Sequence, residues 1–122
     1  MSHIVEIRTQ VRDAAAVRAS CLRLGLTAPV EGLFKLYRET VQGLGVQLRD
    51  WRYPVVFDLA SGKSQFDNFE GHWGDPRRLD EFVQTYAVEK TKIEARKQGY
   101  SVVEQPLADG SIKVTVQVGG VL

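Results

Sequence analysis

The sequence has a single cysteine, Cys21, no long apolar run and almost no net charge. One cysteine excludes an internal disulfide bond, which fits a reducing compartment. A net charge of +1 argues against a protein whose main task is to grip polyanions, because such proteins are usually strongly basic. No apolar stretch is long enough for a signal peptide or a membrane span. We therefore expect a cytoplasmic protein with no membrane partner.

Motifs that are typical of common enzyme classes are also missing. There is no glycine-rich phosphate loop, because Gly43 and Gly45 form a lone pair beside strand signals, which is typical of a turn or bulge. No Ser–His–Asp or Cys–His arrangement is readable, and Cys21 falls on the apolar side of a predicted helix with no base fixed near it. These residues predict no cofactor and no metal, and they favour a non-enzymatic role.

What is present suits one globular domain. The chain has 122 residues, of which 43% are apolar and 25% are charged, so it can bury an ordinary core without metals or disulfides. No linker, low-complexity tract or internal composition change interrupts it. We expect a single domain that covers residues 1–122.

The clearest element is a long helix over residues 75–100. Asp75 is a good N-cap, and Pro76 suits the first helical position, where its missing N–H costs nothing. Gly99 is a natural left-handed end. An apolar stripe recurs at three- and four-residue steps, and its members are Leu79, Phe82, Val83, Tyr86 and Ile93.

The remaining chain predicts one further helix and several strands. Asp13 caps a short helix that ends at Gly25, where Leu26 folds back on Cys21. Asp109 and Gly110 are a strong hairpin signal near the C-terminus. The alternating, strand-like segments are residues 3–9, 34–41, 44–48, 53–59, 65–69, 101–107 and 112–118.

These elements together predict an α+β fold. Clean alternation indicates a twisted, mainly antiparallel sheet of about six to seven strands, with both helices packed on its apolar face and a polar opposite face. Both helices end in glycine followed by an apolar residue, at Gly25-Leu26 and at Gly99-Tyr100. This recurrence leaves open two related strand–helix–strand–strand halves.

Three stretches carry a family resemblance. They are MSHIVEIRTQVRD with the LGL that ends the short helix, FDNFEGHWGD before the long helix, and YAVEKTKIEARKQGYSVVEQPLADGSIKVTVQV. In this order and spacing they resemble the family called hypothetical chloroplast reading frame thirty-five, which is also catalogued as a bacterial domain of unknown function. Residues 27–65 match it only loosely.

The resemblance supports the α+β prediction and leaves the function open. Members occur in algal plastid genomes, in cyanobacteria and in other bacteria, so the resemblance implies the plastid stroma for plastid-encoded relatives and the cytoplasm otherwise. It brings no established activity, cofactor or catalytic residue.

The most suggestive polar cluster precedes and opens the long helix. Its candidate ligand-binding residues are His72, Trp73, Asp75, Arg77 and Arg78, with Asp67, Asn68 and Glu70 just before them. Free N–H groups at a helix N-terminus and two guanidinium groups can hold a phosphate or carboxylate. Carboxylates with a histidine can also bind a metal or act as an acid–base pair, but the spacing matches no standard motif, and His3 joins His72 only if the first strand lies nearby. The alternative is a polar turn in which Trp73 seals the core and Asp75 caps the helix.

Nucleic-acid binding is a weaker interpretation. Tyr37, Arg49 and Trp51 fall on neighbouring predicted strands and would suit a sheet face that stacks bases. The chain has neither an aromatic-rich recognition motif nor a basic balance, so we do not expect this function.

We favour a non-enzymatic protein-interaction or adaptor module that binds a protein partner or its own copy as a homodimer. A wide sheet with only two helices leaves one face and its edge strands available for a partner. The alternative is a small-molecule or anion-binding protein, or an enzyme, built around His72, Asp75, Arg77 and Arg78.

Overall fold

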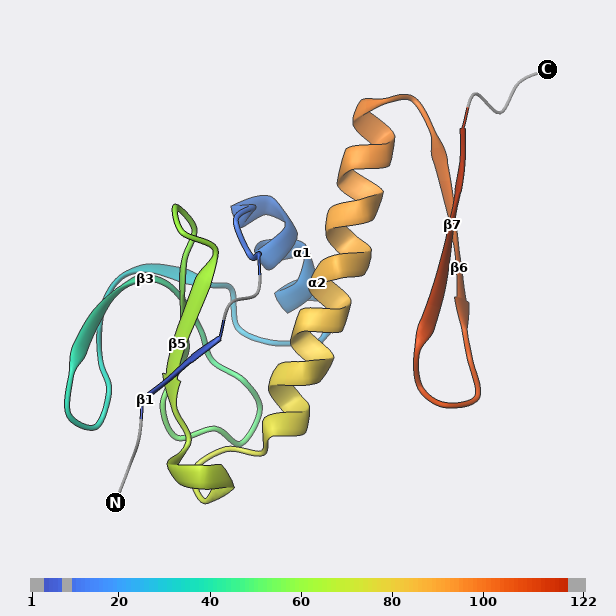
Figure 1. The fold of residues 1–122 in the computed structure, drawn as a ribbon. Coiled ribbons are helices and arrows are strands. Elements are labelled where there is room, and N and C mark those ends of the chain that lie inside the picture. The colour runs from blue at the N-terminus through green and yellow to red at the C-terminus, as the bar shows by residue number, and fades with distance from the viewer. Residues whose placement is uncertain (1–3, 8–9, 119–122) are drawn as a thin grey trace. The chain divides into compact units, whose positions relative to one another are not determined.

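The computed structural model describes residues 4–7 and 10–118, and its elements are drawn in Figure 1. The chain divides into two compact units, unit 1 from Met1 to Tyr86 and unit 2 from Ala87 to Leu122, so the boundary falls within the long helix. The prediction of one domain over residues 1–122 stays a prediction. In chain order the elements are β1 (Ile4–Ile7), α1 (Ala14–Arg23), β2 (Val30–Lys35), β3 (Thr40–Val46), β4 (Val55–Asp58), β5 (Lys63–Asp67), a 3-10 turn (Phe69–Gly71), α2 (Pro76–Lys97), β6 (Ser101–Pro106) and β7 (Ile112–Gln117).

The predicted α+β class, with two helices and antiparallel pairing, is confirmed. The prediction of a single wide sheet needs correction, because the described strands form two sheets. Unit 1 holds a five-stranded sheet in the order β1-β5-β4-β3-β2, and unit 2 holds β6 and β7 alone. The order strand–helix–strand–strand does recur, as β1-α1-β2-β3 and β5-α2-β6-β7, but the second hairpin builds its own sheet. The two strands of a hairpin are joined by a short turn, so they pair with each other without contact with a further strand.

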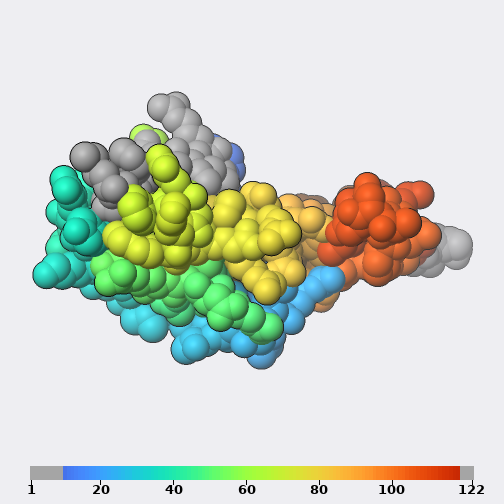
Figure 2. Space-filling view, turned by 90° about the horizontal axis from the view of Figure 1, so that it is seen from below, coloured from blue at the N-terminus to red at the C-terminus, as the bar shows by residue number. Residues whose placement is uncertain are grey.

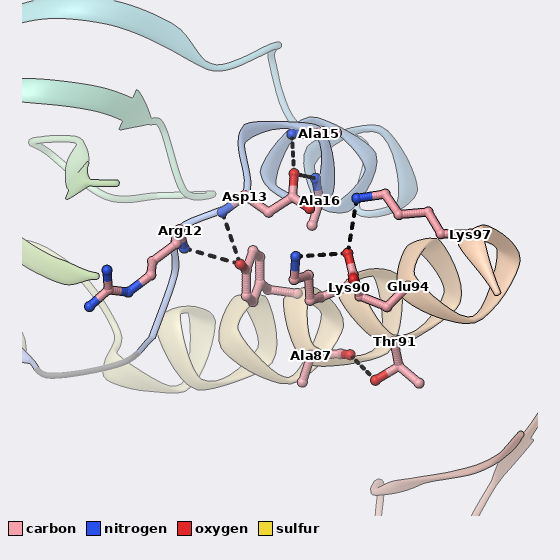
Figure 3. A network of polar contacts seen from close by, with 10 residues as sticks. Arg12, Asp13, Ala15, Ala16, Ala87, Lys90, Thr91, Glu94 and Lys97 are labelled. Atoms are coloured by element: carbon pink, nitrogen blue, oxygen red, sulfur yellow. Dashed lines mark hydrogen bonds and ion pairs between the residues drawn. The ribbon is translucent and has the colours of Figure 1, made fainter. Parts of the chain in front are cut away.

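Both helices begin and end where the cap residues predict. The Asp13 carboxylate accepts hydrogen bonds from the N–H groups of Ala15 and Ala16 (Figure 3). At the end of α1 the Leu26 N–H donates to the Cys21 carbonyl over 2.8 Å, which is the predicted fold-back.

At the end of α2, Gly99 has φ 78°, and the Tyr100 N–H donates to the Ala95 carbonyl over 2.9 Å. The positive φ suits glycine, which has no Cβ to clash. The end of α2 therefore follows the prediction.

The main core of unit 1 lies between its sheet and its helices. Phe82 of α2 stacks on Phe57 of β4, with ring centroids 5.6 Å apart, and both side chains are fully buried. The Tyr86 hydroxyl accepts hydrogen bonds of 3.1 Å from the N–H groups of Arg12 and Asp13, just before α1 (Figure 3). These contacts tie the first half of α2 to both the sheet and the start of α1.

The opposite face of this sheet is not polar, which corrects the prediction. A second cluster of buried side chains lies there, and its members are Leu36, Val41 and Val56, with Phe34 and Tyr53 packed against them. The ring of Phe34 lies over Gly45, where an added Cβ would be 2.4 Å from the ring. A glycine in a strand leaves space for a neighbouring side chain, here the Phe34 ring. The alternation of the sequence does not show which side chain occupies that space.

The first two strands of the middle region also differ from prediction. Residues 34–41 were expected to be one strand, yet β2 ends at Lys35 and β3 begins at Thr40. Between them the Leu36 N–H donates to the Glu39 carbonyl over 2.7 Å, which closes a turn. Leu36 of this turn belongs to the second cluster and Tyr37 packs on Trp73, so the turn has the apolar and aromatic composition of a strand.

Candidate functional site

The loop from Asn68 to Asp75 brings the candidate residues to the start of α2. Phe69, Glu70 and Gly71 all have positive φ, at 46°, 53° and 94°. Two successive non-glycine residues in this region are strained, so their surroundings must hold them there. The Asn68 carbonyl accepts the N–H groups of Gly71 and Trp73 at 3.0 and 2.9 Å, and its side-chain amide donates to the Gly74 carbonyl at 3.3 Å.

Asp67 anchors this loop from the end of β5. Its side chain is buried, and Oδ1 accepts a hydrogen bond from the Phe69 N–H at 3.3 Å. Within the described part of the chain no partner lies within hydrogen-bond distance of Oδ2. Because the bonded oxygen fixes the first left-handed residue, we interpret Asp67 as a positioning residue for the loop.

Trp73 lies among aromatic side chains from three separate segments. Its ring centroid lies 5.1 Å from that of Tyr37, 5.7 Å from that of Tyr53 and 4.8 Å from that of Phe69. The Arg52 guanidinium lies 4.8 Å from the same ring, within the range of a cation–π contact. In Figure 2 the loop, in yellow-green, lies at the surface next to the green segment that precedes β4. Through its contacts with Tyr37 and Tyr53, Trp73 therefore holds the loop against the five-stranded sheet.

His72 is exposed and belongs to the edge of the same aromatic group. Its ring centroid lies 4.9 Å from that of Phe69, and Nδ1 lies 3.2 Å from the Phe69 carbonyl oxygen. A neutral imidazole that carries its proton on Nδ1 would donate this hydrogen bond, and its Nε2 would then be an acceptor.

Asp75 and Arg77 are bound to each other at the first turn of α2. The Asp75 carboxylate accepts the Arg77 N–H at 2.9 Å and the Arg77 guanidinium at 2.8 to 3.2 Å. The side-chain hydrogen bond from Arg77, followed by the backbone bond, lowers the pKa of Asp75 below its ordinary value. Asp75 is therefore the predicted N-cap, and Arg77 holds it in place.

Arg78 lies nearby but pairs in another direction. Its guanidinium lies 3.7 Å from the Glu81 carboxylate, one turn further along α2. An open groove of about 330 Å³ is lined by Asp75, Arg77, Arg78 and Glu81. The structure thus brings both arginines to one groove together with two carboxylates, whereas His72 and Trp73 join the aromatic group and do not line it.

The described residues give little support for metal or thiol chemistry. Across residues 4–7 and 10–118 no group of three or more His, Cys, Asp or Glu side chains is placed to hold a metal ion. His3 lies outside the described residues, so a pairing with His72 stays a prediction. Burial raises the pKa of the Cys21 thiol to about 11, which leaves it protonated at neutral pH. None of the described helices is apolar over a length that could cross a membrane.

Unit 2 contains a second candidate surface, which the site prediction did not include. In the β6–β7 register Val102 pairs with Val116 and Glu104 pairs with Val114. Cross-strand pairs share a face, so one face of the hairpin is mainly apolar. Exposed apolar side chains in this unit are Val103, Leu107, Val116 and Val118.

The apolar face of the hairpin borders a groove within unit 2. The groove has a volume of about 350 Å³ and is lined by Lys90, Thr91, Glu94, Ala95, Gln98, Tyr100 and Val116. Glu94 pairs with Lys90 at 3.0 Å and with Lys97 at 3.1 Å (Figure 3), and these hydrogen bonds lower its pKa. Lys92 pairs with Glu104 at 3.1 Å and so joins α2 to β6. The sequence signal for this surface was the alternation of residues 112–118 after a hairpin turn.

Comparison with known proteins gives one full-length similarity. The chain is 29% identical to "Uncharacterized protein ycf35" of Pyropia yezoensis over 133 residues, which cover 96% of this chain and 97% of that protein. The predicted resemblance to the hypothetical chloroplast reading frame thirty-five family is confirmed by this similarity. The name of the relative states no activity, ligand or partner.

No protein-family model matches the chain. No solved structure matches it either.

Proposed function

We propose that the protein is a non-enzymatic protein-interaction module of the adaptor type, and that the β6–β7 hairpin is its binding element. The observation that carries this proposal is a sheet of only two described strands. Each strand is paired on one side, so each keeps one open edge within the described part of the chain. Hydrogen-bonding groups at such an edge accept an added strand from another chain.

The energetics of a hairpin favour the same interpretation. A two-stranded sheet is marginal in water unless further strands or a packed helix support it. Here no residue of β6 or β7 is fully buried, and apolar side chains such as Val116 and Val118 remain exposed. A partner that adds a strand would cover this apolar surface and extend the ladder. The module would act in the cytoplasm, or in the plastid stroma for plastid-encoded relatives.

The five-stranded sheet offers a competing edge at β2. Val30 and Leu33 are exposed there. This sheet already has five strands and buried side chains on both faces, so it gains less from an added strand. The two edges can be separated by matched substitutions.

The test compares Val118→Lys with Leu33→Lys, because these side chains are 68% and 71% exposed and lie near different edges. Self-association is measured by native mass spectrometry and by light scattering over a concentration series. We expect wild type to associate, Val118→Lys to weaken association by about tenfold or more, and Leu33→Lys to behave as wild type. An effect of Leu33→Lys alone would assign binding to β2 and overturn the role of the hairpin. A protein that stays monomeric at all concentrations would contradict self-association.

The second candidate function is anion binding at the start of α2. Its support is the open groove where Arg77 and Arg78 lie beside the first turn of the helix. An incoming phosphate or carboxylate would replace Asp75 as the partner of Arg77. Calorimetric titration with inorganic phosphate tests this, with the double variant Arg77→Ala/Arg78→Ala as the control. Binding lost in the variant supports the site, and equal heats from both proteins exclude it.

A further inference from the structure

Strand β7 has a sequence suited to pairing with itself. Ile112, Val114 and Val116 alternate with Lys113 and Thr115, and the continuation places Gln117 and Val118 on the same two sides. It contains no proline and only one charged residue, Lys113, so it has few of the features that usually protect an edge strand. Its outer edge is open within the described residues.

Strand β6 is the poorer of the two edges. Pro106 ends it and has no N–H to donate to an added strand. Glu104 in its middle is tied to Lys92 at 3.1 Å. A second strand would therefore pair more completely along β7 than along β6.

The register of a two-fold pairing follows from the alternation. Two identical antiparallel strands pair residue by residue about a central position. A centre on one residue keeps apolar opposite apolar and polar opposite polar, whereas a centre between residues mixes the two faces. With Thr115 at the centre, Val114 lies opposite Val116 of the other copy.

The same centre also satisfies the polar side. Lys113 then lies opposite Gln117 of the other copy, so the two Lys113 side chains do not face each other. Thr115 meets Thr115 of the second copy, and a threonine pair across strands is favourable. At the ends Ile112 lies opposite Val118, which continues the apolar face.

We propose that β7 pairs antiparallel with β7 of a second copy about a two-fold axis at Thr115, giving a four-stranded sheet in the order β6-β7-β7-β6. This inference rests on the proposed function and names its partner as the same chain. Four strands with one continuous apolar face meet the requirement for a stable sheet, which two strands do not.

The experiment introduces one cysteine at a time and follows disulfide formation under mild oxidation by intact mass. Directly opposed residues in an antiparallel pair have Cα atoms about 4.5 to 5.5 Å apart, which a disulfide can span. Cys21 can stay, because it is buried and its thiol is protonated at neutral pH. Thr115→Cys should therefore give a covalent dimer.

Controls fix the register and the edge. Lys113→Cys and Gln117→Cys should each cross-link poorly alone and efficiently when the two proteins are mixed. Val103→Cys is the matched control on β6, because Val103 pairs with Thr115 within the hairpin and shares its face. It should remain uncross-linked.

The outcomes separate the inference from the proposed function. Covalent dimers from Thr115→Cys, with the mixed pair also linked, support β7 pairing at this register. A dimer by native mass spectrometry that cross-links through Val103→Cys, or through neither position, overturns the inference and leaves the interaction module standing. If the wild-type chain stays monomeric throughout the concentration series and Thr115→Cys gives no covalent dimer, pairing through β7 is excluded and self-association fails with it.

Discussion

The two units of this protein hold their strands in different ways. In unit 1 the sheet is covered on both faces, and three of the four residues of β4 are buried. In unit 2 the hairpin has no fully buried residue. Burial of apolar surface is the main favourable term in folding, so unit 1 carries its own stability. The hairpin depends more on its turn, its ladder and whatever covers its apolar face.

The largest effect is expected from Phe82→Ala in the core of unit 1. Phe82 is fully buried on Phe57, and truncating a buried phenylalanine costs about 3 to 5 kcal/mol. Both tryptophans, Trp51 and Trp73, lie in unit 1, so their fluorescence in a urea titration reports this unit.

The matched change in unit 2 is Val114→Ala on the partly buried face of the hairpin. We expect it to change the free energy of unfolding that tryptophan fluorescence reports by no more than about 0.5 kcal/mol, because it shortens a partly exposed side chain. Hydrogen exchange of the β6 and β7 amides follows unit 2 separately. If Val114→Ala shifted the fluorescence midpoint as much as Phe82→Ala does, the two units would not differ in the way proposed.

A second contrast lies between two glycines of the same hairpin in unit 1. An added Cβ at Gly45 would lie 2.4 Å from the Phe34 ring, whereas at Gly32 it would meet nothing within 4 Å. Gly45→Ala should displace Phe34 and destabilise by about 1 to 3 kcal/mol, as overpacking does. Gly32→Ala should be neutral or stabilise by about 0.5 kcal/mol. Equal midpoints for both variants in urea would show that the second cluster does not depend on this contact.

The sequence predicted local features better than distant ones. The caps Asp13 and Asp75, the glycine ends of both helices and the hairpin at Asp109 all depend on neighbours in the chain, and each was found. The packing of Phe34 over Gly45 and of Tyr37 on Trp73 depends on segments far apart in sequence. Alternation shows which residues share a face, but it does not show which strands pair or what covers a face.

The same limit applies to the candidate sites. The residues around Asp75 were identified because they are polar and adjacent in sequence, and the structure shows Arg77 bound to Asp75 itself. The surface in unit 2 was not identified, because its residues come from α2, from the turn that follows α2 and from β7. Its open edges followed only once the hairpin was known to form a sheet of its own.

A smaller effect is expected where α2 meets β6 in unit 2. Lys92 and Glu104 are 3.1 Å apart, with side chains 24% and 23% exposed. A double-mutant cycle with Lys92→Ala and Glu104→Ala should give a coupling energy of about 0.2 to 1 kcal/mol, because partly solvated pairs are screened. The coupling should fall as salt is raised. A salt-independent coupling well above this range would mean that this pair, and not the turn and ladder, dominates unit 2.

The smallest effect concerns pH at the start of α2. The hydrogen bonds from Arg77 lower the pKa of Asp75, so the charged cap stabilises the folded state above the ordinary aspartate pKa. This stabilisation is lost as pH falls through the lowered folded pKa. Asp75→Ala should therefore lower Tm by a constant amount from about pH 5 to 8, and the difference from wild type should shrink below about pH 4. Arg77→Ala keeps the Asp75 cap but removes the main cause of its lowered pKa. As pH falls, this variant should therefore begin to lose the stability that the charged cap provides at a higher pH than wild type does. A Tm difference that stayed constant down to about pH 2 would mean that the charge of Asp75 does not stabilise the helix, and that its hydrogen-bonding geometry alone does.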